Sequence, residues 1–378
     1  MTQAVPTELV GEVRSGHELD IGRLSAFLKQ SAVDIELPIE LKQFKVGQSN
    51  PTFLVVDARG QRFVLRKKPP GQLVSKTAHA VEREFRILDA LGRHSRVPVP
   101  RVYALCEDVA VVGTPFYLME FLNGRVLSDV RLPEIPPHER QLYWGALVDA
   151  AAELHQVDFR AVGLGDYGRV GGFYQRQLRS LTRVAEAQAQ VADKAGVQVG
   201  ELPRFGELRR WFAQQQCPDE TTIVHGDFKM DNVVWHPTEA RIVGILDWEL
   251  STLGNPRTDL ANMLQPLLVP YDSNTEPNSV LQGLQNAPAE EMPPSTDTLL
   301  RRYCARVGRE FPLDGWSFAT VFGLFRNAVI LQGVAARLAK GQASSSFAHV
   351  VALLFPRVMA LAMRIVDGQE AATRRSKL

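Results

Sequence analysis

Cysteine, long apolar runs and excess charge are all scarce in this chain. Its 378 residues include three cysteines, Cys106, Cys217 and Cys304, which are odd in number and lack metal-binding spacing. They are typical of reduced packing residues rather than of a disulfide framework. The formal net charge is +1, so no general electrostatic field attracts nucleic acid or a membrane surface. Any anion-binding site must therefore be local.

Targeting and membrane signals are also sparse. The N-terminal residues lack the apolar stretch of a secretory signal peptide. No uncharged apolar run approaches the length that spans a bilayer, and VVALLFPRVMALAM is interrupted by Pro356 and Arg357. We therefore expect neither nucleic acid nor a membrane as a partner, and the sequence does not indicate the oligomeric state. The final tripeptide Ser376-Lys377-Leu378 matches a peroxisomal address, which predicts the peroxisomal matrix in a eukaryote and the cytoplasm in a bacterium.

Hydrophobic patterning divides the chain into a β-rich first part and a helical second part. Residues 1–20 form a polar lead-in, and helical spacing predicts helices at 21–30 and 81–94. Strands rich in Val, Phe and Leu are predicted at 41–46, 52–58, 62–68, 101–108 and 114–122. Beyond residue 123 the pattern is mainly helical, with short strands around polar turns at 221–227, 232–235 and 240–249. Residues 271–297, rich in Asn, Pro and Ser, are expected to form a mobile surface loop or an insertion. The predicted fold class is α+β, with a small lobe at 21–122 and a larger lobe at 123–378.

The segment VHGDFKMDNVVW, residues 224–235, places many polar groups between apolar runs. Asn232 follows Asp227 by five positions, and Asp247 stands at the end of the apolar strand IVGIL. Phosphoryl transfer needs a carboxylate that orients the attacking hydroxyl and accepts its proton. It also needs an amide and a second carboxylate that hold Mg²⁺ on the nucleotide phosphates. These residues supply that set, and Lys229 is placed to neutralise charge on the transferring phosphoryl group.

A kinase reaction also requires nucleotide-binding elements upstream, and the sequence offers them in the required order. Arg66 provides a cation on the third strand, and Glu84 on the following helix can pair with it. A turn over the phosphates is available in GQSNP, with Gly47, Ser49 and Asn50. The strand FYLMEF then leads to a hinge. These features predict a nucleotide-binding N-lobe.

Together, these motifs resemble the aminoglycoside phosphotransferase and choline kinase-like superfamily, whose fold is that of the protein kinases. The resemblance covers roughly residues 40–340 and is carried by GQSNPTF, VLRKKPPG, EREF, FYLMEF, HGDFKMDN, GILDWE, FRNAVILQGV and GQASS. The chain looks most like the kinase-like domain that occurs alone in many bacteria and is fused to an acyl-CoA dehydrogenase in some animal proteins. The resemblance implies a two-lobed fold, ATP and Mg²⁺ as cofactors, and a small-molecule hydroxyl acceptor. For the fused group the implied acceptor is the 4-hydroxyl of a 4-hydroxyacyl-CoA thioester.

The resemblance also implies roles for individual residues. Asp227 matches the catalytic base, Asn232 and Asp247 match the magnesium ligands, and His225 matches a residue that braces the catalytic loop. Glu84 matches the helix glutamate of the family.

Backbone groups of Glu120 and Leu122 fall in the hinge, where they would meet adenine. Three departures stand out from the family pattern. Arg66 replaces a common lysine, the glycine-rich loop is reduced to one glycine, and Trp248-Glu249 replaces Phe-Gly. The arginine predicts a bidentate phosphate contact rather than a point charge.

Two further polar residues are expected to have structural roles. Asp259, in the segment TDLA, is predicted to cap the next helix and to support the catalytic loop. His155, at the end of a long helix, is predicted to be a capping or packing residue rather than a ligand.

The helix around FRNAVILQGV carries Arg326, Ile330, Gly333, Arg337 and Lys340 along one face at helical intervals, so that its three cations form a basic stripe. Arg326 and Arg337 are candidate acceptor contacts, because an acyl-CoA carries phosphates whereas a polycationic aminoglycoside favours carboxylates. An ordinary core helix with solvated basic residues explains the stripe equally well. An aminoglycoside or amino-alcohol phosphotransferase therefore stays open as an alternative. So does a nucleotide-binding pseudokinase that serves as an interaction module.

Overall fold

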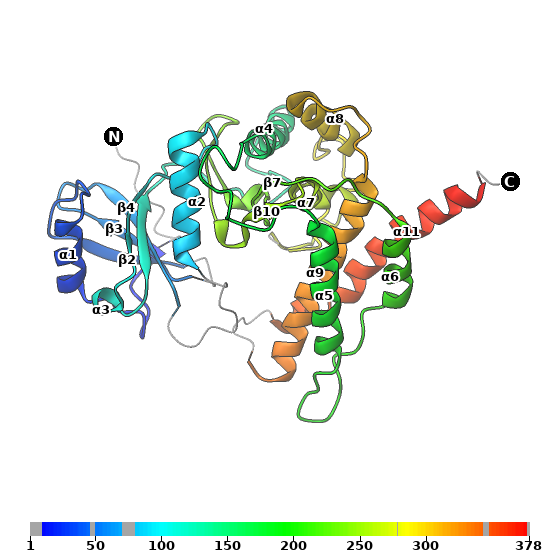
Figure 1. Ribbon diagram of the computed structural model, residues 1–378, viewed down its shortest axis with the longest axis horizontal. Helices are drawn as coiled ribbons and strands as arrows, with labels where there is room; N and C mark the ends of the chain where they lie inside the picture. The colour runs from blue at the N-terminus through cyan, green and yellow to red at the C-terminus, as the bar shows by residue number, and fades with distance from the viewer. Residues whose placement is uncertain (1–9, 46–49, 70–79, 278, 343–347, 376–378) are drawn as a thin grey trace. The chain divides into compact units, whose positions relative to one another are not determined.

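The computed structural model describes the chain except for residues 1–9, 46–49, 70–79, 278, 343–347 and 376–378 (Figure 1). Gly47, Ser49 and the C-terminal tripeptide therefore lie outside the described residues. Contacts within the chain define two compact units. Unit 1 comprises residues 1–126, 158–165 and 232–251, and unit 2 comprises 127–157, 166–231 and 252–378. The predicted lobe boundary at residue 122 stays a prediction.

Unit 1 is built on a six-stranded antiparallel sheet with the order β1-β2-β3-β4-β6-β5. Its strands are β1 (Val10–Gly11), β2 (Glu40–Phe44), β3 (Thr52–Val56), β4 (Arg62–Lys67), β5 (Val102–Cys106) and β6 (Phe116–Glu120). The five strands predicted in this part of the sequence are confirmed. Alternating side chains of β3 and β4, among them Phe53, Val55, Phe63 and Leu65, are fully or almost fully buried on one face.

Helices cover this sheet at positions that follow directly from the sequence. These are α1 (Ile21–Gln30), α2 (Val81–His94) and the short α3 (Val109–Val112). Asp20 caps α1 by accepting a hydrogen bond from the backbone N–H of Arg23 at 2.9 Å, and Leu24 and Leu28 are fully buried against the sheet. The predicted bounds of α1 and α2 are both confirmed. Glu84 lies on the buried side of α2, where polar side chains surround its carboxylate.

A small hairpin completes unit 1. Its strands are β8 (Val233–Trp235) and β9 (Ile242–Ile245), followed by the 3-10 turn η2 (Trp248–Leu250). The hairpin is tied to the segment after β6, because Arg125 and Trp235 exchange two backbone hydrogen bonds of 2.8 Å. Gly124 permits this approach, since a Cβ there would collide with the carbonyl oxygen of Trp235. The hairpin that carries Asn232 and Asp247 at its end is therefore anchored on the segment following β6.

Unit 2 is mainly helical, as predicted. Its helices are α4 (Pro137–His155), α5 (Phe173–Ala189), α6 (Phe205–Gln214), α7 (Arg257–Met263), α8 (Thr296–Val307), α9 (Trp316–Ala339), α10 (Ala348–Val351) and α11 (Phe355–Arg375). Two short strands, β7 (Thr222–Val224) and β10 (Thr252–Gly254), pair antiparallel. The 3-10 turns η1 (Met230–Asn232) and η3 (Gln265–Leu268) follow β7 and α7 respectively.

Helix α9 is the central helix of unit 2. It packs against α5, α7 and α11 (Figure 1), and also against α10. Aromatic side chains such as Phe318, Phe322 and Phe325 fill the core around it. Two stretches, Trp316–Ala339 and Ala348–Ala371, are long and apolar enough to cross a membrane by length and composition, although Arg326 and Arg357 interrupt their apolar runs. The apolar window of α9 is 67% buried inside the protein, so the helix has the composition of a core helix.

The segment 271–297 is more embedded than its composition predicted. Leu281, Gln282 and Leu284 are buried, and the amide of Gln282 donates a 2.7 Å hydrogen bond to Oδ1 of Asp129. Gly283 passes against the backbone of Val269 and Pro270, where no Cβ would fit. The prediction of a surface loop is therefore wrong for its middle, which packs in unit 2.

Candidate active site

Arg66 lies at the centre of a buried ion-pair network in unit 1. Its Nε lies 2.9 Å from Oε2 of Glu84, and its Nη2 lies 2.6 Å from Oδ1 of Asp247. A third carboxylate, Glu249, places Oε2 3.6 Å from the same Nη2. Burial would lower the pKa of Arg66, but the attraction of Glu84 and Asp247 raises it, so the guanidinium stays charged. The structure thus brings together the predicted Arg66–Glu84 pair and the predicted metal ligand Asp247.

Glu84 is held in place by neutral donors as well as by Arg66. Asn50 donates to its Oε1 at 2.8 Å, and the hydroxyl of Tyr117 donates to its Oε2 at 3.0 Å. Burial raises the pKa of Glu84, against the attraction of Arg66. These three partners satisfy a carboxylate that would otherwise be costly to bury. The amide of Asn50 braces Glu84, and its predicted contact with phosphate stays a prediction.

Sequence reasoning did not identify Tyr117. It stands directly opposite Arg66 across the β4–β6 pair, so its hydroxyl reaches the same carboxylate. A tyrosine inside the otherwise apolar segment FYLM was the available signal, since a buried phenol usually has a hydrogen-bond partner.

The hinge residues lie where β6 ends. Glu120 pairs with Phe63, and its Oε2 accepts a 3.1 Å hydrogen bond from the backbone N–H of Arg101. Leu122 fills the space next to Gly244, where a Cβ would collide with it. The role of the Glu120 and Leu122 backbone in binding adenine stays a prediction.

Asn232 and Asp247 meet at one end of the β8–β9 hairpin. The backbone N–H of Leu246 donates to the carbonyl of Asn232 at 2.8 Å, which places Asp247 one residue from that contact. Asp247 has φ 65° and ψ 59°, a left-handed conformation that is uncommon outside glycine and often marks functional sites. Its side chain is 36% exposed. The pair thus offers an amide and a carboxylate near the Arg66 network.

The chemistry of these donors fits Mg²⁺. Oxygen ligands from one or two side chains, completed by nucleotide phosphates, are its usual environment in kinases. Across the described part of the chain, no group of three His, Cys, Asp or Glu side chains is arranged to hold a metal ion by itself. A metal at Asn232 and Asp247 would therefore depend on the nucleotide for its remaining ligands.

Replacing Arg66 with glutamine is expected to destabilise unit 1 and to weaken nucleotide binding. The substitution leaves Glu84 buried without its counter-charge, which typically costs about 3–5 kcal/mol. Denaturant unfolding and an ATP titration measure the two effects. Lys42→Gln, which removes an exposed ion pair with Glu40 in the same sheet, is the matched control and should have little effect. Equal stability of the two variants would contradict the structural role of Arg66.

The predicted catalytic loop lies in unit 2 and follows strand β7. Asp259 anchors it through hydrogen bonds to two backbone N–H groups. Its Oδ2 accepts a hydrogen bond from the backbone N–H of His225 at 2.7 Å, and its Oδ1 accepts one from Gly226 at 2.8 Å. Gly226 adopts φ 85°, which favours glycine at this turn. The backbone N–H of Asp227 in turn donates to Nδ1 of His225 at 3.2 Å. The predicted bracing roles of His225 and Asp259 are therefore present in the structure. The predicted capping role of Asp259 is wrong, because among the described residues its carboxylate bonds to the loop and to His155 rather than to the start of its helix.

A buried hydrogen-bond chain extends from Asp259 into the helical core. Nε2 of His155 lies 3.2 Å from Oδ2 of Asp259, and its Nδ1 lies 2.9 Å from the hydroxyl of Tyr303. Burial acts to raise the pKa of Asp259, but the hydrogen bond from His155 and the attraction of His155 and His225 lower it overall. The chain links α4, α7 and α8 to the catalytic loop. His155 is thus a packed, hydrogen-bonded residue, as predicted.

The carboxylate of Asp227 is oriented through both of its oxygens. Asn262 donates to Oδ1 at 3.1 Å, and Nζ of Lys229 lies 3.5 Å from Oδ2. Lys229 also lies 3.2 Å from Asp231, and these two carboxylates raise its pKa although burial acts to lower it. The side chain of Asp227 remains 30% exposed, which leaves it accessible to a substrate. Asn262 was missed from sequence, although its i, i+3 spacing from Asp259 on one helix places both on the side of the loop.

The two candidate acceptor contacts on α9 have different environments. Arg326 is half-buried, whereas Arg337 is exposed near the C-terminal end of the helix. Burial lowers the pKa of Arg326, while the charges of Asp227 and Asp259 act to raise it. The predicted basic stripe is therefore not one uniform surface, because Arg326 is half-buried and Arg337 is exposed.

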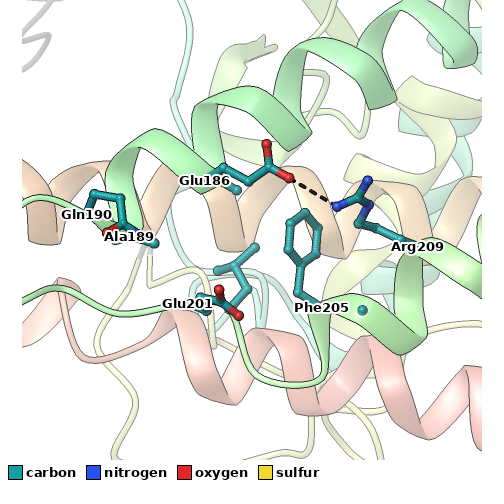
Figure 2. Close-up of a pocket in the computed structure, with 9 residues that line it drawn as sticks. Glu186, Ala189, Gln190, Glu201, Phe205 and Arg209 are labelled. Atoms are coloured by element: carbon teal, nitrogen blue, oxygen red, sulfur yellow. Dashed lines mark hydrogen bonds and ion pairs between the residues drawn. The ribbon is translucent and has the colours of Figure 1, made fainter.

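A small pocket lies elsewhere in unit 2, between α5 and α6 (Figure 2). In Figure 2 the side chains of Glu186 and Arg209 point toward one another beside Phe205, with an ion-pair distance of 3.0 Å. Its volume of about 180 Å³ is below the range of typical small-molecule sites, roughly 300–1,000 Å³. None of the predicted site residues lines it. We therefore do not assign it as the active site.

Comparison with known proteins agrees with this geometry. Residues 40–299 match the model of the phosphotransferase enzyme family. Acyl-CoA dehydrogenase family member 10 of Mus musculus is 40% identical over 314 residues, which are 82% of this chain and 28% of that protein. Acyl-CoA dehydrogenase family member 11 of Gallus gallus is 38% identical over 345 residues, which are 89% of this chain and 42% of that protein. The chain thus spans less than half the length of these relatives.

Solved structures agree on the fold. A crystal structure from Ralstonia eutropha, provisionally named an aminoglycoside phosphotransferase, has a TM-score of 0.79 and 36% identity. The match covers 93% of this chain and 99% of the Ralstonia eutropha chain. A macrolide 2′-phosphotransferase from Brachybacterium faecium has a TM-score of 0.54 and 18% identity, covers 89% of this chain and 98% of its own, and supports the fold alone.

These findings confirm the predicted kinase-like α+β fold and the resemblance to the kinase-like region of acyl-CoA dehydrogenase family proteins. They also confirm the enzyme class, an ATP-dependent phosphotransferase with an alcohol group as acceptor. The chain belongs to the phosphotransferase enzyme family.

Proposed function

We propose that this enzyme transfers the γ-phosphoryl group of Mg²⁺-bound ATP to the 4-hydroxyl of a 4-hydroxyacyl-CoA. The hydroxyl oxygen forms a bond to the γ-phosphorus while the bond from that phosphorus to the β–γ bridging oxygen breaks. ADP leaves, and the hydroxyl proton passes to Asp227. The observation that carries the proposal is the orientation of Asp227 by Asn262 and Lys229 through separate carboxylate oxygens.

The donor side of the reaction is assigned to unit 1. Arg66, held by Glu84, would contact the nucleotide phosphates, and its charge is maintained by the surrounding carboxylates. Asn232 and Asp247 would hold Mg²⁺, which would neutralise negative charge on the phosphates when bound. Backbone groups of Glu120 and Leu122 would bind adenine. His225 would keep the catalytic loop in its observed conformation through the N–H of Asp227.

The acceptor class is supported by the relatives and by charge. Two similar proteins, both longer than this chain, carry the name acyl-CoA dehydrogenase. The region that matches this chain is therefore found in proteins named for acyl-CoA chemistry. A cation, Arg326, is coupled to the charge of Asp227. That cation would disfavour a polycationic aminoglycoside and favours an acceptor that carries oxygen acceptors or negative charge.

The decisive experiment is mass-spectrometric detection of phosphate transfer from Mg·ATP. The panel contains 4-hydroxyacyl-CoAs, aminoglycosides and amino alcohols, with Asp227→Ala as the control. A phosphorylated 4-hydroxyacyl-CoA that is absent from the control supports the proposal. Phosphorylation of an aminoglycoside or amino alcohol alone would assign the alternative acceptor. ATP binding without any transfer would instead favour a pseudokinase.

A further inference from the structure

Arg326 is a half-buried cation that lacks a partner within the described part of the chain. Its guanidinium makes no hydrogen bond or ion pair with any residue that the structure describes. Its neighbour Asn327, by contrast, donates a 2.5 Å hydrogen bond to Gln265 in η3. A guanidinium carries five N–H donors, and shielding them from water without acceptors is costly. A cation in this state is suited to a ligand that brings its own acceptor.

Helix packing places Arg326 on the side of α9 that faces α7, the helix that holds the proposed base. A Cβ added to Gly323 of α9 would lie 3.4 Å from the Cβ of Ala261 on α7, so the two helices are in close contact there. Asn262, the next residue of α7, donates to Asp227. Arg326 follows Gly323 by one helical turn and therefore lies on the same side of α9. Its electrostatic coupling to Asp227 agrees with this placement.

We infer that Arg326 binds an acyl oxygen of the acceptor, and so positions the hydroxyl at Asp227. This inference rests on the proposed function. In a 4-hydroxyacyl group, the acyl oxygen and the hydroxyl are separated by a short, fixed number of bonds, so one residue can hold each end. The same chemistry is offered by a thioester carbonyl and by the carboxylate of a free 4-hydroxy acid. Arg326 is thus a specificity-determining residue that selects acceptors with an oxygen acceptor near the hydroxyl.

The test measures equilibrium binding by calorimetry, with a saturated acyl-CoA that lacks the hydroxyl and cannot react. Arg326→Gln is expected to weaken binding about 10- to 100-fold, the effect of losing one charged hydrogen bond. Arg326→Lys, which keeps the charge, should recover part of the affinity. Arg364→Gln on α11, an exposed arginine in the same unit, is the matched control and should bind like the wild type. Titration with the corresponding free carboxylate distinguishes the two sources of the acyl oxygen.

A second measurement separates an acceptor role from a nucleotide role. With a 4-hydroxyacyl-CoA as substrate, Arg326→Gln should raise the KM for the acceptor and leave the KM for ATP unchanged. Circular dichroism and thermal unfolding establish that the variant is folded.

Three results would overturn the inference: wild-type affinity in a folded Arg326→Gln variant, an effect confined to the KM for ATP, or failure of the wild type to bind either acyl ligand. The proposed function is judged separately by wild-type transfer in the acceptor panel. If Arg326→Gln binds the acyl ligand like the wild type and still phosphorylates a 4-hydroxyacyl-CoA, the proposed function stands and the role of Arg326 is rejected.

Discussion

Asp227→Ala should lower kcat by about 10²- to 10⁴-fold, the usual contribution of a positioned general base. The side chain is 30% exposed and its partners Asn262 and Lys229 can turn to water, so the fold should remain intact. Steady-state phosphorylation of the acceptor identified by the panel measures the loss. Thermal unfolding of the same preparation reports stability.

Two companion variants sharpen this test. Asp227→Asn preserves the shape of the side chain and can still accept from Asn262, but it cannot take the hydroxyl proton. It should therefore be impaired to a similar degree. Arg364→Gln, on the exposed surface of α11, should retain wild-type turnover. Near-normal kcat in Asp227→Ala would remove Asp227 from the chemistry.

Asp259→Ala should destabilise the protein by about 3–5 kcal/mol, the cost of breaking a buried charged interaction. The substitution removes the acceptor for two backbone N–H groups, those of His225 and Gly226, and the partner of His155. Urea unfolding measures the loss. Asp259→Asn keeps one oxygen acceptor and nearly the same volume, so it should be destabilised less. Equal stability of wild type and Asp259→Ala would contradict the bracing role.

The same carboxylate predicts a pH dependence. Although burial acts to raise the pKa of Asp259, the hydrogen bond and charge of His155 hold it below the ordinary value of 3.8. An acid with a lowered folded-state pKa contributes stability above its unfolded pKa and loses it as the pH falls through the folded pKa. The stability difference between wild type and Asp259→Asn should therefore be constant near neutral pH and shrink below pH 3.8. A difference that grows on acidification would reverse the assigned sign.

Local pattern was enough to predict much of the fold. The bounds of α1 and α2 follow from apolar spacing and, for α1, from the cap at Asp20, all of which are encoded within a few residues. The strands of unit 1 are short and rich in β-branched and aromatic residues, which the pattern also captures. Composition did not predict the buried residues at 281–284, because an Asn- and Pro-rich segment can still bury a few apolar side chains that anchor it.

The site was predictable where its residues form a motif or follow a set order of elements, as Arg66 and Glu84 do. Asp227, Asn232 and Asp247 form a compact pattern with chemical meaning. Tyr117 reaches Glu84 through strand register, and Asn262 reaches Asp227 through the placement of α7, so both depend on tertiary structure.

The contrast between Arg326 and Arg337 arises in the same way. Helical spacing placed both on one face of α9, but the packing of α7 near Gly323 affects the environment of only one end. Sequence periodicity identifies which residues share a face. It does not identify which part of that face is covered.

The grouping of residues 232–251 with the N-terminal sheet has a mechanical consequence. The Arg66–Asp247 ion pair and the backbone bonds between Arg125 and Trp235 place the proposed metal ligands, the proposed phosphate-binding cation and the predicted hinge in one unit. Asp227 belongs to unit 2, and the peptide bond between Asp231 and Asn232 is one of five points at which the chain passes between the units. Contacts within unit 1 thus hold the proposed phosphoryl donor site, and contacts within unit 2 hold the proposed base.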